Sequence, residues 1–117
     1  MIPSQTMQSE VIVTHRVPGF HFWPGAEGDV SYLANRHRHQ FLFVVAWDVT
    51  HDDRDIEFHT AQAWLRDTYQ ANADFGAKSC EMIAKDLAAK IAEAGHKHPS
   101  WIEVWEDEEN GAKVRFV

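Results

Sequence analysis

The sequence predicts an α+β domain in which two helices cover one face of an antiparallel sheet. Three observations predict it: two stretches rich in β-branched and aromatic residues in the first half, two helical patterns in the middle, and a hairpin pattern with period two at the end. The predicted order of elements is ββααββ. Strands and helices that are segregated along the chain in this way are typical of α+β folds.

A long loop separates the first two predicted strands. Residues 9–16 are rich in β-branched side chains and predict the first strand. Residues 17–36 contain two prolines and three glycines, so we expect them to be mostly loop. Residues 39–50 are rich in Phe, Val and Trp, which predicts a central strand with both faces covered, and HDDRD at 51–55 predicts a turn.

Two helices are expected next. Residues 58–70 consist largely of helix formers with apolar side chains at helical spacing. The second helix has clearer limits, because Ser79 is a good N-cap, Glu81 lies in the first turn and Gly95 supplies a stop. Its predicted apolar face consists of Cys80, Ile83, Ala84, Leu87, Ala88, Ile91 and Ala94.

The last predicted elements form a hairpin. Residues 101–107 alternate in polarity and predict a strand, residues 109–112 contain Asn-Gly and predict a tight turn, and residues 112–117 predict the closing strand. Residues 1–8 are polar and are expected to fray. The whole chain, 1–117, is therefore expected to be one domain.

Composition restricts the class of protein. Eighteen acidic against eleven basic residues give a net charge of −7, which argues against nonspecific binding to nucleic acid. The chain has no apolar run of about 20 residues, its start lacks the pattern of a signal peptide, and Cys80 is the single cysteine. We therefore expect a cytoplasmic protein. Helices on one side leave the other sheet face and the sheet edges open, so we also expect a homo-oligomer.

The histidines are the strongest candidates for a functional site. His37 and His39 lie at i and i+2, so in a strand both imidazoles project from one face and could share a metal ion. His21 is the preferred third ligand and His15 is its rival, since both lie near the end of the first strand. Three nitrogens and one open position would be a catalytic arrangement. The alternative is that RHRH is a basic turn that holds an anion, in a structural oligomer without metal.

Several segments together resemble a known family. GFHFWP, RHRHQFLFVV, DIEFHTAQAWL, KSCEMIAKDLAAKI and IEVWEDEENGAKV are similar, in this order, to motifs of the 6-pyruvoyl-tetrahydropterin synthase and 6-carboxy-tetrahydropterin synthase family. The resemblance covers nearly the whole chain, although each piece matches loosely. It implies the tunnelling fold (T-fold) and a homo-oligomer, a hexamer by family likeness.

The resemblance also implies a site. His21, His37 and His39 would bind Zn²⁺, and Glu106 would pair with the adjacent N–H donors of a pterin- or purine-like ligand, because a carboxylate can accept both. Ser79 and Cys80 would line the same pocket. Glu106 also lies in an acidic run, and such runs are usually solvated.

The chain lacks the residues that members of this family use for proton transfer. The residues before the histidine pair, Tyr32 to Asn35, contain no nucleophilic cysteine, and the family's aspartate–histidine pair is missing. His59, His51 and Asp67 are the available acid–base candidates. Two functions follow from the resemblance: a zinc-dependent carbon–oxygen lyase acting on a dihydroneopterin-triphosphate-like substrate, or a non-catalytic protein that binds a pterin or nucleotide. Compact variants of the family also occur in bacteriophage genomes, and by analogy this suggests deazaguanine-type base modification or ligand sequestration as roles.

Overall fold

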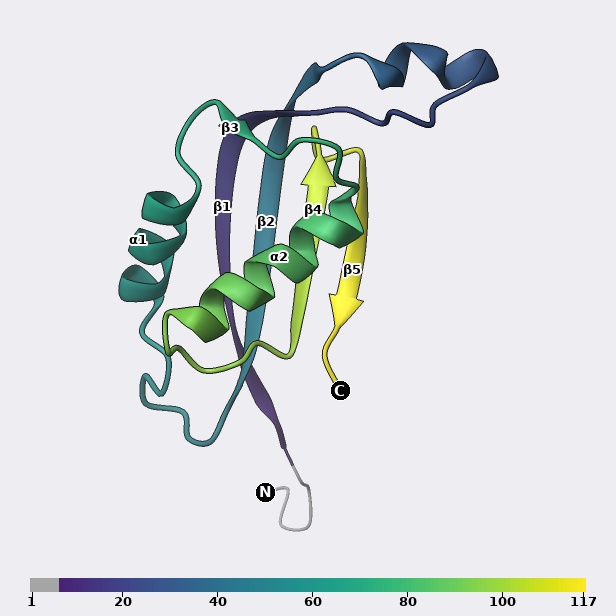
Figure 1. Cartoon of the computed structure of the whole chain (residues 1–117). Coiled ribbons are helices and arrows are strands. Elements are labelled where there is room, and N and C mark those ends of the chain that lie inside the picture. Colours follow the sequence, from purple (N-terminus) through teal and green to yellow (C-terminus); the bar gives the residue numbers. More distant parts are fainter. Residues whose placement is uncertain (1–6) are drawn as a thin grey trace.

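A five-stranded sheet and two α-helices form the fold, which is seen in a computed structural model that describes residues 7–117 (Figure 1). In chain order the elements are β1 (Ser9–His21), the 3-10 helix η1 (Gly28–Ala34), β2 (His37–Val49), α1 (Phe58–Thr68), β3 (Ala73–Asp74), α2 (Cys80–Glu93), β4 (Trp101–Glu106) and β5 (Asn110–Arg115). Residues 1–6 of the segment expected to fray lie outside the described residues. Within residues 7–117, no helix is both long and apolar enough to span a membrane.

The sheet has the strand order β3-β1-β2-β4-β5 and is antiparallel except at one edge. The two long strands β1 and β2 pair over their full length, from Ser9 opposite Val49 to His21 opposite His37. β4 pairs with the middle of β2, and Phe41 lies opposite Glu106. The two-residue strand β3 runs parallel to the end of β1. These registers bring the end of β1, the start of β2 and the end of β4 to one end of the sheet.

Both helices lie on the same face of the sheet, α1 against β1 and α2 across β4 and β5 (Figure 1). Alternate strand residues point toward them and are buried with the apolar helix faces. The largest fully buried side chains include Val17, Phe41, Phe43, Leu65, Ile83, Leu87 and Ile102. The predicted α+β class, with two helices on one face of a mostly antiparallel sheet, is confirmed and is consistent with a T-fold arrangement. The predicted order ββααββ lacked the short parallel strand β3 between the helices.

The first strand is longer than predicted, since β1 continues to His21 and takes in five residues expected to be loop. Pro18 is tolerated within it because its backbone faces away from β2: its carbonyl accepts from the Asn72 N–H on the β3 side, at 2.8 Å. Gly19 allows a close approach, because a Cβ there would lie 2.7 Å from the Phe75 ring. Both residues that suggested a loop are thus accommodated where β3 joins the sheet.

The remainder of the predicted loop is also partly ordered. Residues 22–36 leave the sheet as an arm that contains η1 and projects beyond the strands (Figure 1). The arm is tied to itself by the bond from Trp23 N–H to the Leu33 carbonyl, at 2.8 Å. Trp23 and Tyr32 on this arm are exposed.

The last hairpin turns three residues earlier than Asn-Gly suggested. Asp107 and Glu108 occupy the left-handed region, with φ of 54° and 56°, and β5 already begins at Asn110. Gly111 lies within the strand, opposite Trp105. A Cβ at this glycine would lie 2.5 Å from Trp105 Cδ2, so the glycine is required by the indole packed over it.

The second helix agrees with the prediction at both ends. Ser79 is the N-cap and its hydroxyl accepts from the Met82 N–H, at 3.2 Å. Gly95 follows the helix with φ of 77°. Six of the seven residues predicted for the apolar face are buried, whereas Ala94 is the exposed C-cap residue. α1 ends two residues before the predicted limit.

Candidate metal centre

Three histidines converge at the end of the sheet from which the arm projects. His21 is the last residue of β1 and lies opposite His37, the first residue of β2. His39 follows on the same face of β2, so it is diagonal to His21. One ligand nitrogen from each ring can be chosen so that all three lie within 4.8 Å of one another. The same sheet face holds the core, and His21 is only 7% exposed.

Each of the three rings is oriented by an oxygen acceptor at Nδ1. His21 Nδ1 lies 2.9 Å from the Lys78 carbonyl oxygen, and His37 Nδ1 lies 2.9 Å from the Asn35 carbonyl oxygen. His39 Nδ1 lies 2.7 Å from a carboxylate oxygen of Asp107. These oxygens can only accept, so each Nδ1 carries the proton and donates it. In this tautomer of a neutral ring, Nε2 carries a lone pair that can bind a metal ion.

This arrangement of imidazoles suits a metal ion. Nε2 of His21 and Nε2 of His39 are buried and have no hydrogen-bond partner among the described residues. A buried acceptor without a partner is costly, and a shared cation satisfies both. Histidines that bind metal ions usually donate the other ring N–H to a carbonyl or carboxylate, as all three do here. The donor set and its orientation therefore fit a zinc ion.

Glu106 lies beside the rings of His21 and His39 at the end of β4. One carboxylate oxygen is 3.1 Å from His21 Nε2 and the other is 3.5 Å from His39 Nε2. The contact to His21 does not meet hydrogen-bond geometry. The Cys80 thiol donates to Glu106, with Sγ 3.6 Å from Oε1. Glu106 therefore faces the histidines, whereas Glu103 on the other sheet face accepts from the Trp105 indole N–H.

The ionisation of these groups is coupled. Burial lowers the pKa of His21, but the Glu106 carboxylate and the Lys78 carbonyl outweigh it, so the net shift is upward from 6.5. The contact with His21 in turn holds the pKa of Glu106 below its ordinary value. Burial, with the charge of Glu106, raises the pKa of Cys80 to about 12, so this thiol stays protonated at neutral pH.

A cavity of about 370 Å³, which we call the metal pocket, opens beside the histidines. Its walls come from the ends of β1 and β4, the arm and the start of α2, where Ser79 and Cys80 lie. The lining residues are His21, Phe22, Trp23, Leu33, His37, Ala77, Lys78, Ser79, Cys80, Glu81, Met82, Glu106, Asn110 and Gly111. The pocket thus combines aromatic and aliphatic walls with a carboxylate and the first turn of a helix.

The other sequence candidates lie elsewhere. His15 is on β1, and its Nε2 is 2.8 Å from the Tyr69 carbonyl oxygen, so the geometry selects His21 over this rival. His51 and His59 line a separate cavity near the start of β1 and do not reach the metal pocket. Asp67 lies at the rim of the larger groove between the helices.

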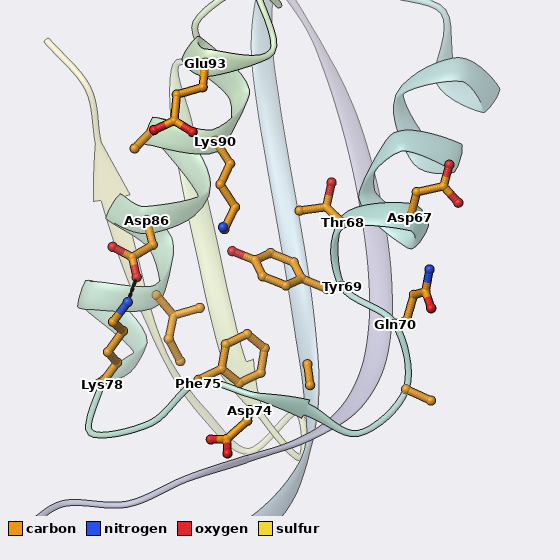
Figure 2. A pocket seen from close by; sticks show the side chains of 14 residues that line it. Asp67, Thr68, Tyr69, Gln70, Asp74, Phe75, Lys78, Asp86, Lys90 and Glu93 are labelled. Carbon is orange, nitrogen blue, oxygen red and sulfur yellow. Dashed lines mark hydrogen bonds and ion pairs between the residues drawn. The ribbon is translucent and has the colours of Figure 1, made fainter.

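That groove, which we call the interhelical groove, has a volume of about 670 Å³ and runs between the end of α1 and the length of α2 (Figure 2). Tyr69 and Phe75 form its floor, and Lys78 forms an ion pair with Asp86 at one end (Figure 2). None of the eight histidines lines it. The three converging histidines therefore lie outside this groove, two of them in the lining of the smaller metal pocket.

Sequence reasoning missed Asp107, which it placed in a solvated acidic run. In the structure one carboxylate oxygen accepts from His39 Nδ1 and the other accepts from the Gln40 N–H, at 2.8 Å. These bonds lower the pKa of Asp107, the backbone donor contributing most. Its position directly after Glu106, the carboxylate that the resemblance indicated, was the available signal.

Comparisons with known proteins add evidence on the fold. No protein-family model matches the chain, and no curated protein matches it significantly. Among solved structures, the crystal structure of an uncharacterized protein from Wolinella succinogenes is similar, with a TM-score of 0.66 and 11% sequence identity. The similarity covers 94% of this chain and 99% of that one. At this identity the likeness supports the α+β fold alone.

Proposed function

We propose that this protein binds one zinc ion through Nε2 of His21, His37 and His39 and holds a flat pterin- or purine-like ligand in the adjacent metal pocket. The observation that carries the proposal is the orientation of the rings. All three Nδ1 atoms lie against oxygen acceptors, and two of the opposing Nε2 atoms are buried without a partner. A shared cation would satisfy these two nitrogens and could take the third from His37.

The choice of zinc rests on the donor set. Imidazole ligands suit zinc, copper, iron and nickel, and three histidines with one further position are typical of catalytic zinc sites. When bound, zinc would polarise an oxygen atom placed on it. The chain's own residues bind and orient: Asp107 holds the ring of His39, and Lys78 and Asn35 hold the other two through their carbonyl oxygens.

The ligand class follows from the walls of the metal pocket. Phe22, Trp23 and Leu33 offer apolar surface, which suits the faces of a flat ring system. Glu106 offers two acceptor oxygens to adjacent N–H donors on the ring edge. The resemblance to the tetrahydropterin synthase family points to the same class of ligand.

Binding without turnover is favoured over the carbon–oxygen lyase activity that the resemblance implies. His51, His59 and Asp67, the acid–base candidates from the sequence, do not line the metal pocket. The Cys80 thiol does line it, but its pKa is raised to about 12, so it is a poor nucleophile and base. The lyase remains the second candidate, because the residues that the resemblance implies for it, Glu106 and the three histidines, lie close together.

The metal is tested by elemental analysis of the purified protein, covering zinc, copper, iron and nickel. We expect one zinc per chain, lost in His39→Ala and His37→Ala. His15→Ala is the matched control and should retain zinc, because its ring is bonded to the Tyr69 carbonyl. Circular dichroism of each variant separates loss of metal from loss of fold. A folded wild type without stoichiometric metal, or a zinc-free His15→Ala beside a zinc-loaded His39→Ala, would refute the site.

Turnover and binding are separated by two measurements on the zinc-loaded protein. Release of triphosphate from 7,8-dihydroneopterin triphosphate would establish the lyase. A co-purified ring compound in native mass spectrometry, with no triphosphate release, is the outcome we expect. If neither ligand nor turnover is detected, the pterin or purine assignment fails while the metal site stands.

The remaining expectations complete the proposal. The exposed sheet face and edges favour a homo-oligomer, and the resemblance favours a hexamer. The net charge of −7 makes nucleic acid a poor partner. A single cysteine with a protonated, buried thiol suits the reducing cytoplasm.

A further inference from the structure

Glu106 occupies an unusual position for a residue that only anchors a ligand. Its two oxygens lie 3.1 Å from His21 Nε2 and 3.5 Å from His39 Nε2. The side chain thus faces the same two nitrogens that lack hydrogen-bond partners. Glu106 also lines the metal pocket, so the same carboxylate can contact either a bound small molecule or an ion held by the histidines.

These distances match those between neighbouring ligands of one ion. With zinc–nitrogen and zinc–oxygen bonds of about 2.0–2.2 Å and tetrahedral angles, two ligand atoms lie about 3.3–3.5 Å apart. The observed separations, 3.1 Å from Oε1 to His21 Nε2 and 3.5 Å from Oε2 to His39 Nε2, place each oxygen close to this spacing from one histidine nitrogen. Carboxylate oxygen is an ordinary zinc ligand beside imidazole.

The surroundings of Glu106 hold it there. The register that pairs Phe41 with Glu106 brings the carboxylate next to His39, which is two residues from Phe41 on β2. The Cys80 thiol, at 3.6 Å, donates to the oxygen that faces His21. Metal-binding carboxylates are commonly supported by such a donor.

We infer that Glu106 is the fourth protein side chain that coordinates the metal ion when no small molecule occupies the metal pocket. The coordination site is then closed until a pterin- or purine-like molecule binds. This inference rests on the proposed zinc site. It gives the carboxylate two alternative partners, the ion and the N–H edge of the ligand. A small molecule whose N–H edge pairs with the carboxylate frees the fourth coordination position on the metal for one of its own oxygens. Binding of the small molecule and opening of the metal site are therefore coupled.

The test uses the protein loaded with Co²⁺, whose visible absorption reports coordination, and azide as a probe of an open position. In the wild type we expect no spectral change with azide, because no position is open. Glu106→Gln keeps the shape but is a poor ligand, so azide should shift its spectrum. Its dissociation constant for zinc should rise by about 100-fold or more, beyond the loss expected from an outer partner.

Two further variants separate ligation from charge. Glu106→Asp keeps the negative charge but moves the oxygens back by the length of one methylene group. If Glu106 coordinates the metal, this variant should respond to azide. If Glu106 acts only through its charge, the variant should not respond. Glu103→Gln on the opposite face of β4 is the matched control and should behave as the wild type. An azide response in the wild type, or unchanged zinc affinity in Glu106→Gln, would overturn the inference but leave the three-histidine site intact. If the wild type binds neither Co²⁺ nor Zn²⁺, both this inference and the proposed zinc site are overturned.

Discussion

At the scale of single residues, the orientation of the histidines depends on their oxygen partners. The Lys78 and Asn35 carbonyls belong to the backbone and cannot be removed by substitution. The Asp107 carboxylate is the one side chain among these partners, and it accepts from His39 Nδ1 at 2.7 Å. It is therefore the residue through which the affinity of the proposed zinc site can be changed without replacing one of the three histidines.

Asp107→Asn should weaken zinc binding by about 10–100-fold while leaving the fold intact. The amide accepts from Nδ1 more weakly than the carboxylate, and Asn tolerates the left-handed backbone at this position. Competition titration with a chromophoric chelator measures the affinity. Glu108→Gln, one residue further along the same turn, is the control. Equal affinities in the two variants would show that Asp107 does not support the site.

The stability of the metal-free protein should depend on pH through His21 and Glu106. The pKa of His21 is raised, so its contribution is complete below about 6.5 and is lost as the pH rises through the folded value. The pKa of Glu106 is lowered, so its contribution is present above about 4.5 and is lost as the pH falls. The pair therefore stabilises the metal-free fold most between these two values.

Urea denaturation of the chelator-treated protein across this range measures the effect. The midpoint should be highest between pH 4.5 and 6.5 in the wild type, and this maximum should weaken in Glu106→Gln. Addition of zinc should raise the urea midpoint most at pH values above about 6.5, since the ion binds only unprotonated Nε2 atoms. A Glu106→Gln profile that parallels the wild type would contradict the coupling.

At the scale of the elements, α2 begins at a cap that also forms part of the metal pocket. The Ser79 hydroxyl accepts from the Met82 N–H, which satisfies one of the free donors in the first helical turn. Ser79→Ala should lower the free energy of unfolding by about 1 kcal/mol, whereas Ser79→Asp should preserve it. Chemical denaturation of both variants makes the comparison. Equal losses would show that the cap bond does not contribute.

The hairpin of β4 and β5 depends on a glycine beneath an indole. In Gly111→Ala the new Cβ would lie 2.5 Å from Trp105 Cδ2 and 2.7 Å from the Val104 carbonyl oxygen, so the strand must shift. Overpacking of this kind costs about 1–3 kcal/mol. Gly25→Ala is the control, because its nearest neighbour is the movable Trp23 side chain at 3.3 Å. A thermal midpoint of Gly111→Ala equal to that of Gly25→Ala would contradict this account.

At the scale of the whole molecule, the described residues leave one sheet face without a helix. The side chains on that face include half-buried Leu42, Val44 and Trp105 and exposed Ile12. The outer edge of β5 and most of the outer edge of β1 pair with no other strand in residues 7–117. Apolar surface and open edges of this extent favour self-association.

Light scattering coupled to size-exclusion chromatography should therefore give a mass several times the 13.4 kDa of one chain. Six times this mass would agree with the family likeness. Ile12→Glu places a charge on the exposed sheet face and should lower the mass, whereas Ala92→Glu at an exposed position of α2 should not. A wild type that elutes as a monomer at micromolar concentration would rule out the oligomer.

Some features of this protein were determined by local sequence. Ser79, Glu81 and Gly95 set the limits of α2, and the spacing of its apolar residues set its buried face. His37 and His39 were identifiable because a strand places residues i and i+2 on one face. Capping, periodicity and alternation act over a few residues, so they can be read without knowing what the chain folds against.

Other features were decided only by the tertiary structure. Pro18 and Gly19 suggested a loop, yet pairing with β2 over its full length carries β1 to His21, because the tertiary neighbours outweigh local preference. Asn110 and Gly111 lie within β5 instead of in the turn, and Gly111 pairs with Trp105, whose indole leaves no room for a Cβ there. The choice of His21 over His15, the bond from Asp107 to His39 and the approach of Glu106 all depend on strand register. Register is a long-range property, because it is fixed by contacts between residues far apart in the chain.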